Sequence, residues 1–272
     1  MRVSRGGLVY AAVAGSFMLL LVWAERRWPL RKRIESSPVH TARNLALAGS
    51  SLAISQSLEG VVTPALFRLA ETYQLGLLRR LPLPYPLRQA AGFLLLDYSL
   101  YWWHWLNHRI PFLWRGHLVH HVDVDMDAST GLRFHFWELV LTLALRCVQI
   151  LVLGVDRQVL QIWNRSLLLA VVFQHSNLRL SEDLEAILGK VLVTPEAHAL
   201  HHSQNQEEGQ SNFSSMLIIW DRLHGTHLGH RLGTNGKIGV PDYPQPLGLE
   251  NCLRLPFESH PSGWSSAARD AS

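Results

Sequence analysis

The sequence predicts an all-α protein, an integral membrane helical bundle of about 4–5 membrane helices with a histidine-rich cytosolic cap. Apolar runs of up to membrane-crossing length recur from the N-terminus to residue 173, and basic or aromatic segments flank them. The chain also contains 15 histidines, most of them after the third apolar run. Hydrophobic residues make up 48% of the 272 residues. That fraction is lower than a pure membrane bundle carries, so a sizeable polar part is expected beside the membrane helices.

The first predicted domain, residues 1–88, holds the N-terminal membrane helices and a connector. Residues 8–24 form an apolar run of about one membrane thickness, and the basic cluster after it is typical of a stop-transfer flank. The last three residues of this run could alternatively form a signal-peptidase site. Residues 45–70 form a second run that several serines interrupt, so it either spans the membrane or lies partly in the interface. Prolines break residues 81–86 into a connector.

The second predicted domain, residues 89–230, combines membrane helices with the histidine clusters. Residues 89–106 form the third apolar run, and the aromatic residues at its far end mark a membrane–water boundary. Residues 139–155 and 159–173 are two shorter apolar runs around a tight turn, which predicts a helical hairpin. The remaining segment, residues 231–272, is predicted to be a C-terminal tail rich in proline and glycine.

The distribution of charge places the predicted histidine cap on the cytoplasmic side. Residues 26–43 contain six Lys or Arg whereas residues 71–88 contain three, so the first loop is expected to be cytoplasmic. If the second run spans the membrane, the third helix and the hairpin bring all histidine groups to that same side. The arginine-rich composition and the lack of a retention signal favour a bacterial inner membrane, with the endoplasmic reticulum as the alternative. The basic residues lie beside apolar runs and form no nucleic-acid patch, so no nucleic acid is expected as a partner.

Three histidine patterns predict a metal site. His104 and His108 have i, i+4 spacing, so on a helix they share one face. The pattern His-x-x-His-His occurs twice and each time puts three imidazoles on one side of a helix. Together the patterns supply eight candidate ligands: His104, His108, His117, His120, His121, His198, His201 and His202. Two further candidate ligands are His175, where the hairpin ends, and His135.

The number of imidazoles predicts two metal ions. Eight imidazoles brought together cost desolvation free energy and repel one another when protonated, whereas neutral imidazoles are good metal donors. A structural zinc ion needs only four ligands, usually with cysteine, and the two cysteines of this chain are far apart without CxxC spacing. No HExxH occurs, so a metalloprotease would lack its general base. Two iron ions that activate O₂ fit this donor set best.

Longer motifs surround these histidines and are very specific in combination. They read Asp97-Tyr98-Ser99-Leu100-Tyr101-Trp102-Trp103-His104-x3-His108, Leu113-Trp114-Arg115-x-His117-x2-His120-His121 and Thr194-Pro195-Glu196-x-His198-x2-His201-His202-Ser203, followed by Asn212-Phe213 and Trp220-Asp221-Arg222-Leu223-His224-Gly225-Thr226. This segment, about half of the chain, resembles the fatty acid hydroxylase/sterol desaturase superfamily of membrane-bound, histidine-rich di-iron oxygenases. The resemblance implies a di-iron site, O₂-dependent hydroxylation or desaturation of lipid C–H bonds, and a membrane helix bundle with a cytosolic histidine-bearing part.

Three positions depart from the usual motifs of that superfamily. Phe136 stands where Arg-x-His-Pro-x-Glu often has proline, Ser214 stands where glycine follows Asn-Tyr/Phe, and His224 stands where phenylalanine precedes the final Gly-Thr. The eight core histidines are unaffected. The departures therefore bear on substrate and subfamily.

The sequence thus predicts a catalytic domain that hydroxylates a C–H bond of a lipid, fatty acyl or sterol-like substrate with O₂ and external electrons. A lipid or sterol desaturase that uses the same site is the first alternative, and a non-catalytic metal-binding membrane protein is the second. No ferredoxin-type cysteine motif, Rossmann glycine pattern or haem module occurs in the sequence, so electrons are expected from a separate reductase chain.

Some residues near the motifs are expected to support the site. Asp97 is predicted to hydrogen-bond a ligand imidazole and not to bind metal itself. Asn177 is predicted either to hydrogen-bond near the metal or to cap a helix. A hydrocarbon tail is expected to slide sideways from the membrane into an apolar tunnel, because leaving the bilayer would cost it about 0.8 kcal/mol per CH₂. Candidate lining residues from the third run and the hairpin are Leu94, Leu95, Tyr98, Leu168 and Val172.

The histidines outside these patterns are not assigned to the main site. His224, His227 and His230 have three-residue spacing and form either a minor metal patch or an exposed polar surface. His40 and His260 are expected at the surface.

Overall fold

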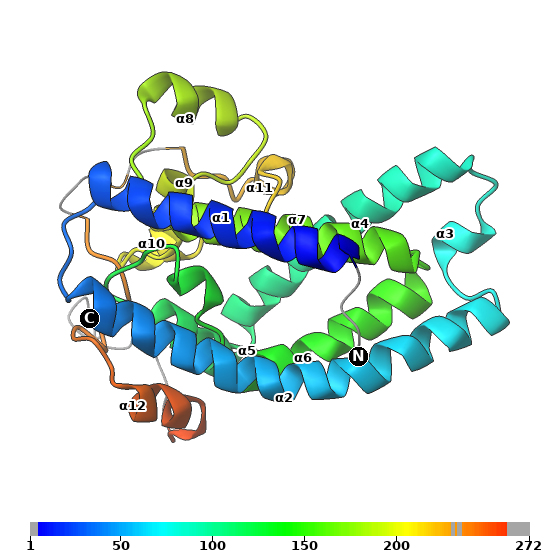
Figure 1. The fold of residues 1–272 in the computed structure, drawn as a ribbon, viewed down its shortest axis with the longest axis horizontal. Coiled ribbons are helices and arrows are strands. Elements are labelled where there is room, and N and C mark those ends of the chain that lie inside the picture. The colour runs from blue at the N-terminus through cyan, green and yellow to red at the C-terminus, as the bar shows by residue number, and fades with distance from the viewer. Residues whose placement is uncertain (1–4, 230–231, 233–235, 260–272) are drawn as a thin grey trace.

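Two long helices, α1 (Arg5–Arg27) and α2 (Ser37–Thr72), run along the molecule and are joined by a short linker (Figure 1). The computed structural model describes residues 5–229, 232 and 236–259, and within these ranges it contains helices but no strands, which confirms the predicted all-α class. By length and hydropathy, the stretches Gly6–Arg27 and Ser37–Arg80 can cross a membrane. No other described helix passes that test: Phe136–Cys147 has only 12 residues, and polar side chains interrupt the longer helices Tyr85–Arg109 and Arg157–His175.

Three further helices complete the bundle. α4 (Tyr85–Arg109) follows the short α3 (Leu77–Arg80). It packs against the helices at residues 136–147 and 157–175. α6 (Phe136–Cys147) continues into a π-helical turn (Val148–Val152), and α7 (Arg157–His175) then returns, so the expected hairpin is present. α2 packs along α6, and α1 packs on α7. The bundle therefore brings the end of α7 back to the same end of the molecule as the last turns of α4.

Short helices close this end of the bundle (Figure 1). They are α5 (Pro111–His121), α8 (Glu182–Leu188), α9 (Pro195–His201), α10 (Gln206–Gly209), α11 (Ile219–His224), α12 (Leu249–Arg254) and the 3₁₀ turns Thr130–Leu132 and Leu255–Phe257. The start of α9 is fixed by its first residues. The Thr194 side chain accepts a hydrogen bond from the Ala197 amide, and Pro195 occupies the first turn, where its missing N–H costs nothing.

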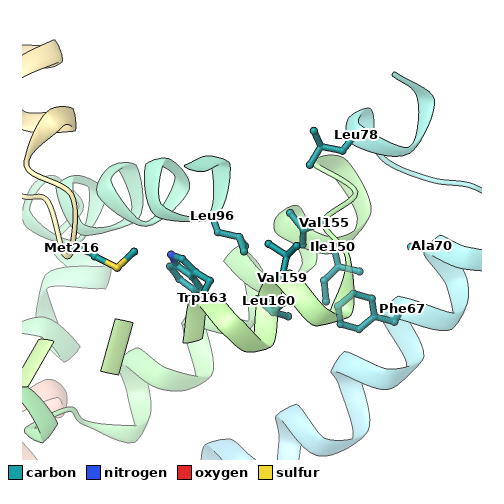
Figure 2. Close-up of a cluster of buried hydrophobic side chains, with 10 residues drawn as sticks. All are labelled: Phe67, Ala70, Leu78, Leu96, Ile150, Val155, Val159, Leu160, Trp163 and Met216. Carbon is teal, nitrogen blue, oxygen red and sulfur yellow. The ribbon is translucent and has the colours of Figure 1, made fainter. Parts of the chain in front are cut away.

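A buried apolar cluster at the α3 end of the bundle fixes the spacing of the long helices (Figure 2). Phe67 of α2, Leu96 of α4 and Trp163 of α7 meet there, each no more than 2% exposed. Burying such side chains stabilises the fold by about 1.5–3 kcal/mol each. The cluster therefore fixes the relative positions of α2, α4 and α7, and the histidines lie at the far ends of α4 and α7.

A second apolar cluster packs the C-terminal segment against α5. Leu118 of α5 and Leu47 of α2 are fully buried there, together with Cys252 and Leu255. Arg133 crosses the same region and donates hydrogen bonds to the Val119 carbonyl at 2.8 Å and to the Cys252 Sγ at 2.9 Å. α5 is thus fixed from three sides, which matters because it carries three of the predicted ligands.

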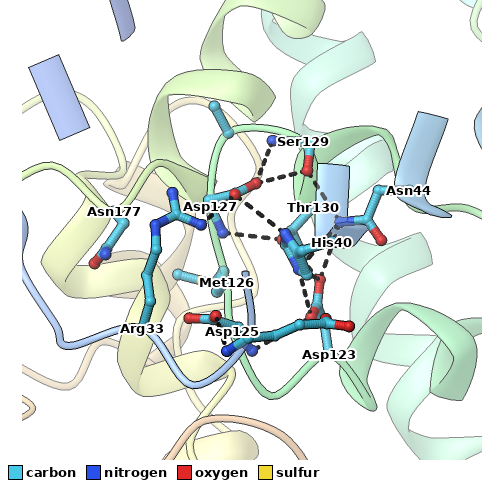
Figure 3. A network of polar contacts seen from close by, with 12 residues as sticks. Arg33, His40, Asn44, Asp123, Asp125, Met126, Asp127, Ser129, Thr130 and Asn177 are labelled. Carbon is cyan, nitrogen blue, oxygen red and sulfur yellow. Dashed lines mark hydrogen bonds and ion pairs between the residues drawn. The ribbon is translucent and has the colours of Figure 1, made fainter. Parts of the chain in front are cut away.

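A polar network joins the α1–α2 linker to the loop that follows α5 (Figure 3). His40 lies at its centre and is fully buried, so the expectation that His40 lies at the surface is wrong. Its Nε2 lies 2.8 Å from Asp123 and its Nδ1 lies 3.1 Å from Asp127. The carboxylates that make this burial possible lie more than 80 residues farther along the chain, so the sequence around His40 could not predict the contact. Arg33 adds an ion pair with Asp127 at 2.8 Å.

Asn177, which follows α7, hydrogen-bonds to the α1–α2 linker. Its Oδ1 accepts from the Arg31 amide and its Nδ2 donates to the Arg31 carbonyl, both at 2.9 Å. The Asn177 amide donates to Glu25 at 3.0 Å. The residue therefore ties the segment after α7 to the end of α1.

The His40 network yields a stability prediction. We expect His40→Leu to destabilise the protein by about 3–5 kcal/mol, because it leaves buried Asp123 and Asp127 without their shared partner. His227→Leu, at an exposed histidine, is the control and should have little effect. Thermal unfolding of both variants in detergent measures the difference. Equal melting temperatures for the two variants would contradict this account of the network.

The network also has a defined pH dependence. Burial by itself raises the pKa of Asp127, but hydrogen bonds from His40, Ser129 and Arg33 lower it to about 2. A carboxyl with a lowered pKa in the folded state contributes stability above its ordinary pKa, and this contribution is lost as the pH falls through the folded-state value. The ion pair between Asp127 and Arg33 therefore persists at all pH values above about 4.

Candidate metal centre

The ends of four structural elements supply nine histidines that point toward one another. α4 contributes His104 and His108 from its last two turns, and α7 contributes its last residue, His175. The two His-x-x-His-His motifs lie on α5 and at the end of α9, as their spacing predicts. All nine are buried except His108, which is half-buried.

The nine imidazoles form two groups. Within each group, one possible ligand nitrogen per residue lies within 4.8 Å of every other. The first group is His104, His108, His117, His121 and His201, and the second group is His120, His175, His198 and His202. The groups adjoin, because the rings of His121 and His202 stack with centroids 4.3 Å apart.

The two His-x-x-His-His motifs contribute to the groups in opposite ways. On α5 the outer pair, His117 and His121, enters the first group, while His120 enters the second. At α9 the outer pair enters the second group and His201 enters the first. Residues i and i+4 share a face of a helix and residue i+3 is rotated from it, so one motif reaches two neighbouring points. Each short helix is thereby shared by both groups.

Hydrogen bonds fix which nitrogen of each ring is free in the first group. The Nδ1–H of His104 donates to the Phe213 carbonyl at 2.7 Å. The Nδ1–H of His117 donates to Glu138 at 2.9 Å. Each ring therefore keeps its lone pair on Nε2, and the two Nε2 atoms lie only 3.1 Å apart. Facing lone pairs repel unless a cation lies between them.

The second group repeats this arrangement around His175. Its Nδ1–H donates to the Val171 carbonyl at 2.7 Å, which leaves Nε2 as an acceptor. That Nε2 lies 2.9 Å from the Nε2 of His120 and 2.9 Å from the Nε2 of His198. One point thus receives three ring nitrogens from three elements.

Most of the remaining ring nitrogens lack a partner in the part of the chain that the structure describes, although His201 Nδ1 lies 2.7 Å from the Ser211 carbonyl. Both nitrogens of His108, His121 and His202 are buried without a hydrogen-bond partner among the described residues. An unsatisfied buried polar group costs about 1–3 kcal/mol, so this density of such atoms in a native fold requires a ligand. Neutral, convergent imidazole nitrogens are suitable metal donors, and the two groups therefore fit two metal ions.

Burial keeps several of these rings uncharged. Burial lowers the pKa of His201 to about 3, and nearby imidazoles add to the effect. Burial likewise holds the pKa of His198 and His202 well below its ordinary value. The rings are therefore ready to bind a cation near neutral pH without first losing a proton.

A close approach of α5 and α6 places Glu138 against His117. A Cβ on Gly116 would lie 2.8 Å from the Trp137 ring and 3.1 Å from Glu138, so only glycine permits this helix spacing. Glu138 was not singled out from the sequence as a partner of a ligand, although it completes the Arg-x-His-x-x-Glu motif. A carboxylate at the start of an apolar run was the signal that could have identified it.

An apolar cavity of about 200 Å³ opens onto both groups. His104 and His117 of the first group and His120, His175 and His198 of the second lie in its wall. The apolar part of the wall comes from Leu100, Trp103, Phe134, Leu139, Leu167 and Val171. The cavity therefore provides room for a hydrocarbon segment directly beside the histidines.

The structure places several predicted residues away from the two groups. The Nδ1 of His135 accepts a hydrogen bond from the Trp137 amide, and its Nε2 lies 3.3 Å from the Leu253 carbonyl. The ring of His135 thus caps α6 and contacts the C-terminal segment. Asp97 accepts from the Trp220 indole at 2.7 Å and from the Leu217 amide at 3.2 Å, so it positions the α11 region and contacts no imidazole of the groups.

The predicted tunnel residues divide between different surroundings. Leu95 and Tyr98 line a second apolar cavity of about 480 Å³, farther along α4. Leu94 and Leu168 are exposed, and Val172 packs near α1. Leu167 and Val171, which directly precede Leu168 and Val172 on α7, line the 200 Å³ cavity beside the histidines instead. We call this the inner cavity and the 480 Å³ cavity the outer cavity. A shift of one residue rotates a side chain by about 100° around the helix, which explains the difference.

The other unassigned histidines lie apart from the groups. His224 stacks between the aromatic rings of Tyr98 and Tyr101, and its Nε2 lies 3.2 Å from the Tyr98 hydroxyl. His227 is exposed. His230 and His260 lie outside the described residues.

Fold and site together define a class of protein: a membrane-associated helical bundle with a buried all-histidine centre at one end, whose two groups could each hold a metal ion. The sequence model of the family described as "Fatty acid hydroxylase" matches residues 89–226, and the chain belongs to this family. The matched segment contains every histidine of the two groups. No solved structure matches the chain.

Several curated proteins are similar to the chain. Alkylglycerol monooxygenase from Danio rerio is 34% identical over 64% of this chain and 36% of its own length. Alkylglycerol monooxygenase from Xenopus tropicalis is 32% identical over 50% of this chain and 29% of its own length. Ornithine lipid hydroxylase OlsE from Rhizobium tropici is 30% identical over 58% of this chain and 46% of its own length. The matches thus span less than half the length of these relatives.

The two groups can be separated by substitution. We expect His201→Ala, in the first group, and His120→Ala, in the second, each to reduce bound metal from about two ions per chain to about one. His135→Ala should retain both ions, since neither of its ring nitrogens reaches a group. Elemental analysis of the purified variants measures the content. Full metal content in both group variants would contradict the assignment of ligands.

Proposed function

We propose that this chain is a membrane-bound di-iron oxygenase that hydroxylates a C–H bond of a lipid, using O₂ and external electrons. The observation that carries the proposal is the apolar cavity whose wall includes histidines of both groups. A cavity of that kind brings hydrocarbon and metal ligands together, which a structural or storage metal site does not need. The relatives described above carry the names monooxygenase and hydroxylase, which favours hydroxylation over desaturation.

Iron is the proposed metal because of the donor set and the number of ligands. The nine donors are all imidazoles, which suit iron, and no cysteine joins either group among the described residues. With two iron ions bound, the centre would supply O₂-dependent oxidation of a C–H bond. The protein itself would hold the ligand tautomers, as Glu138 does when it keeps a proton on His117 Nδ1.

The apolar wall would position the substrate and exclude water. Leu139 of α6 and Leu167 of α7 face the inner cavity from two sides, so a hydrocarbon segment between them would lie beside the histidines. An apolar wall also removes water that would compete for the oxidant. These residues act by positioning, and reaction specificity would follow from which carbon they hold nearest the metals.

The outer cavity suggests how a lipid tail reaches the centre. It is lined by Leu95 and Tyr98 of α4 and by residues of α6 and the π-helical turn, and Trp103 lines both cavities. A tail would therefore enter sideways between α4 and α6 and pass Trp103. The candidate membrane spans α1 and α2 lie beside α7 and α6, which supports access from the bilayer and not from water.

Two further parts of the proposal concern the surroundings of the enzyme. Electrons would come from a separate reductase chain. The proposed location is a bacterial inner membrane with the histidine end in the cytoplasm, supported by the excess of basic residues between α1 and α2.

Lipid analysis tests the reaction directly. We expect cells that produce the protein to contain a lipid species heavier by one oxygen atom, and cells that produce His201→Ala to lack it, because that variant loses a ligand of the first group. Mass spectrometry of total lipids under ¹⁸O₂ measures the product. A lipid that has lost two hydrogens would identify the desaturase alternative. If the lipids do not change although the purified protein contains metal, the result would favour the alternative of a non-catalytic metal-binding membrane protein.

Two adjacent leucines test the cavity. We expect Leu167→Trp to fill the inner cavity and to lower activity on long-chain substrates by at least about tenfold, because the reacting carbon is displaced. Leu168→Trp is the matched control, since Leu168 is exposed and should tolerate the ring. Activity is compared at equal iron content. If both variants behave alike, the inner cavity does not hold the substrate.

A further inference from the structure

The inner cavity contains polar atoms that the protein does not satisfy. Four residues of its wall have a buried polar side-chain atom without a hydrogen-bond partner among the described residues: Trp103 Nε1, Asn107 Oδ1, Glu138 Oε2 and Gln174 Oε1. Asn107 and Gln174 are each 2% exposed. More than 90% of buried polar groups in native proteins have a partner, so four exceptions in one small wall point to a missing partner.

The contrast with a neighbouring glutamine makes the pattern specific. Gln149, fully buried in the π-helical turn, donates to Ser99 at 2.8 Å and accepts from Arg146 at 2.5 Å. The Oε1 of Gln174 accepts no hydrogen bond from the residues that the structure describes. The fold thus pairs both amide atoms of Gln149, whereas the Oε1 of Gln174 in the cavity wall has no partner among the described residues.

The open amides flank the metal ligands from two helices. Asn107 lies between His104 and His108 on α4, and Gln174 directly precedes His175 on α7. Rotation about the last side-chain bond presents either the oxygen or the N–H₂ of an amide, so each can accept or donate. A bound group that both donates and accepts would satisfy both of them beside the reacting position.

We propose that the inner cavity binds a lipid segment that carries a hydroxyl or a secondary amide close to the carbon that is oxidised. The proposal rests on the function proposed above and names the substrate class of that same site. A plain acyl segment would leave the wall's polar atoms without partners. Apart from the metal ions, nothing in the wall would offset the charge of a phosphate, since no Lys or Arg lines the cavity among the described residues.

Stability without substrate gives the first test. Replacement of an unsatisfied buried amide by an apolar side chain of similar volume removes an uncompensated polar group. Gln174→Met is therefore expected to leave the melting temperature of the purified protein unchanged or to raise it. Gln149→Met, which breaks satisfied hydrogen bonds, should lower it by about 2–4 °C or more. An equal loss in both variants would overturn the claim that Gln174 is open.

Ligand binding gives the second test and needs no turnover. The probes are 1-dodecanol, N-methyldodecanamide and dodecane, and their dissociation constants come from the ligand-induced shift of the melting temperature. The proteins are the iron-loaded wild type and the double variant Asn107→Leu/Gln174→Met, both in lipid nanodiscs. Partition into lipid differs between the probes but not between the proteins, so the ratio between the proteins is the readout. Iron content is checked for each sample.

The expected result is a selective loss. The double variant should bind the alcohol and the amide about fivefold or more weakly than the wild type does, and should bind dodecane equally or more tightly. An unchanged preference for the polar probes would overturn the proposal, and so would an equal loss for all three; either result would assign the open amides to bound water. Absence of lipid oxidation under ¹⁸O₂ would instead count against the proposed function, because the binding ratio does not depend on turnover.

Discussion

The repulsion between imidazole lone pairs is the constraint on which this structure depends. Backbone carbonyls and Glu138 hold protons on Nδ1, so the Nε2 atoms of His104 and His117 face each other at 3.1 Å with nothing to share. Packing of the helices brings these two nitrogens together, and bound cations remove the repulsion between their lone pairs. Much of the fold, including the apolar cluster at the α3 end and the clamp on α5, therefore serves to hold an arrangement that is unfavourable by itself.

Local spacing made the helices and most of the ligand set predictable. The i, i+3, i+4 patterns placed eight histidines on helix faces, and the end of the hairpin added His175, because helix periodicity acts within a few residues. Partners that arrive from elsewhere in the chain were not predictable. The burial of His40 depends on Asp123, and the tautomer of His104 depends on the Phe213 carbonyl, 109 residues away.

The lining of the cavity illustrates a different limit. An apolar run identifies α7 as a wall, but it does not fix the rotation of the helix. The sequence favoured Leu168 and Val172, whereas Leu167 and Val171 face the cavity. Rotation is set by packing of α7 against α1, α4 and α9, and these contacts are tertiary. Conclusions about substrate shape therefore needed the structure, while conclusions about metal chemistry did not.

The bridge from Arg133 to Cys252 bears on how the protein matures in the cell. Arg133, which fixes α5 in place, depends on a partner synthesised 50 positions after His202, the last histidine of the two groups. During translation the imidazoles thus emerge before the lock that orders them. We expect the histidine groups to reach their final arrangement only after Cys252 has been synthesised and has docked on Arg133. Assembly of the histidine centre thus depends on a residue far along the chain from the histidines themselves.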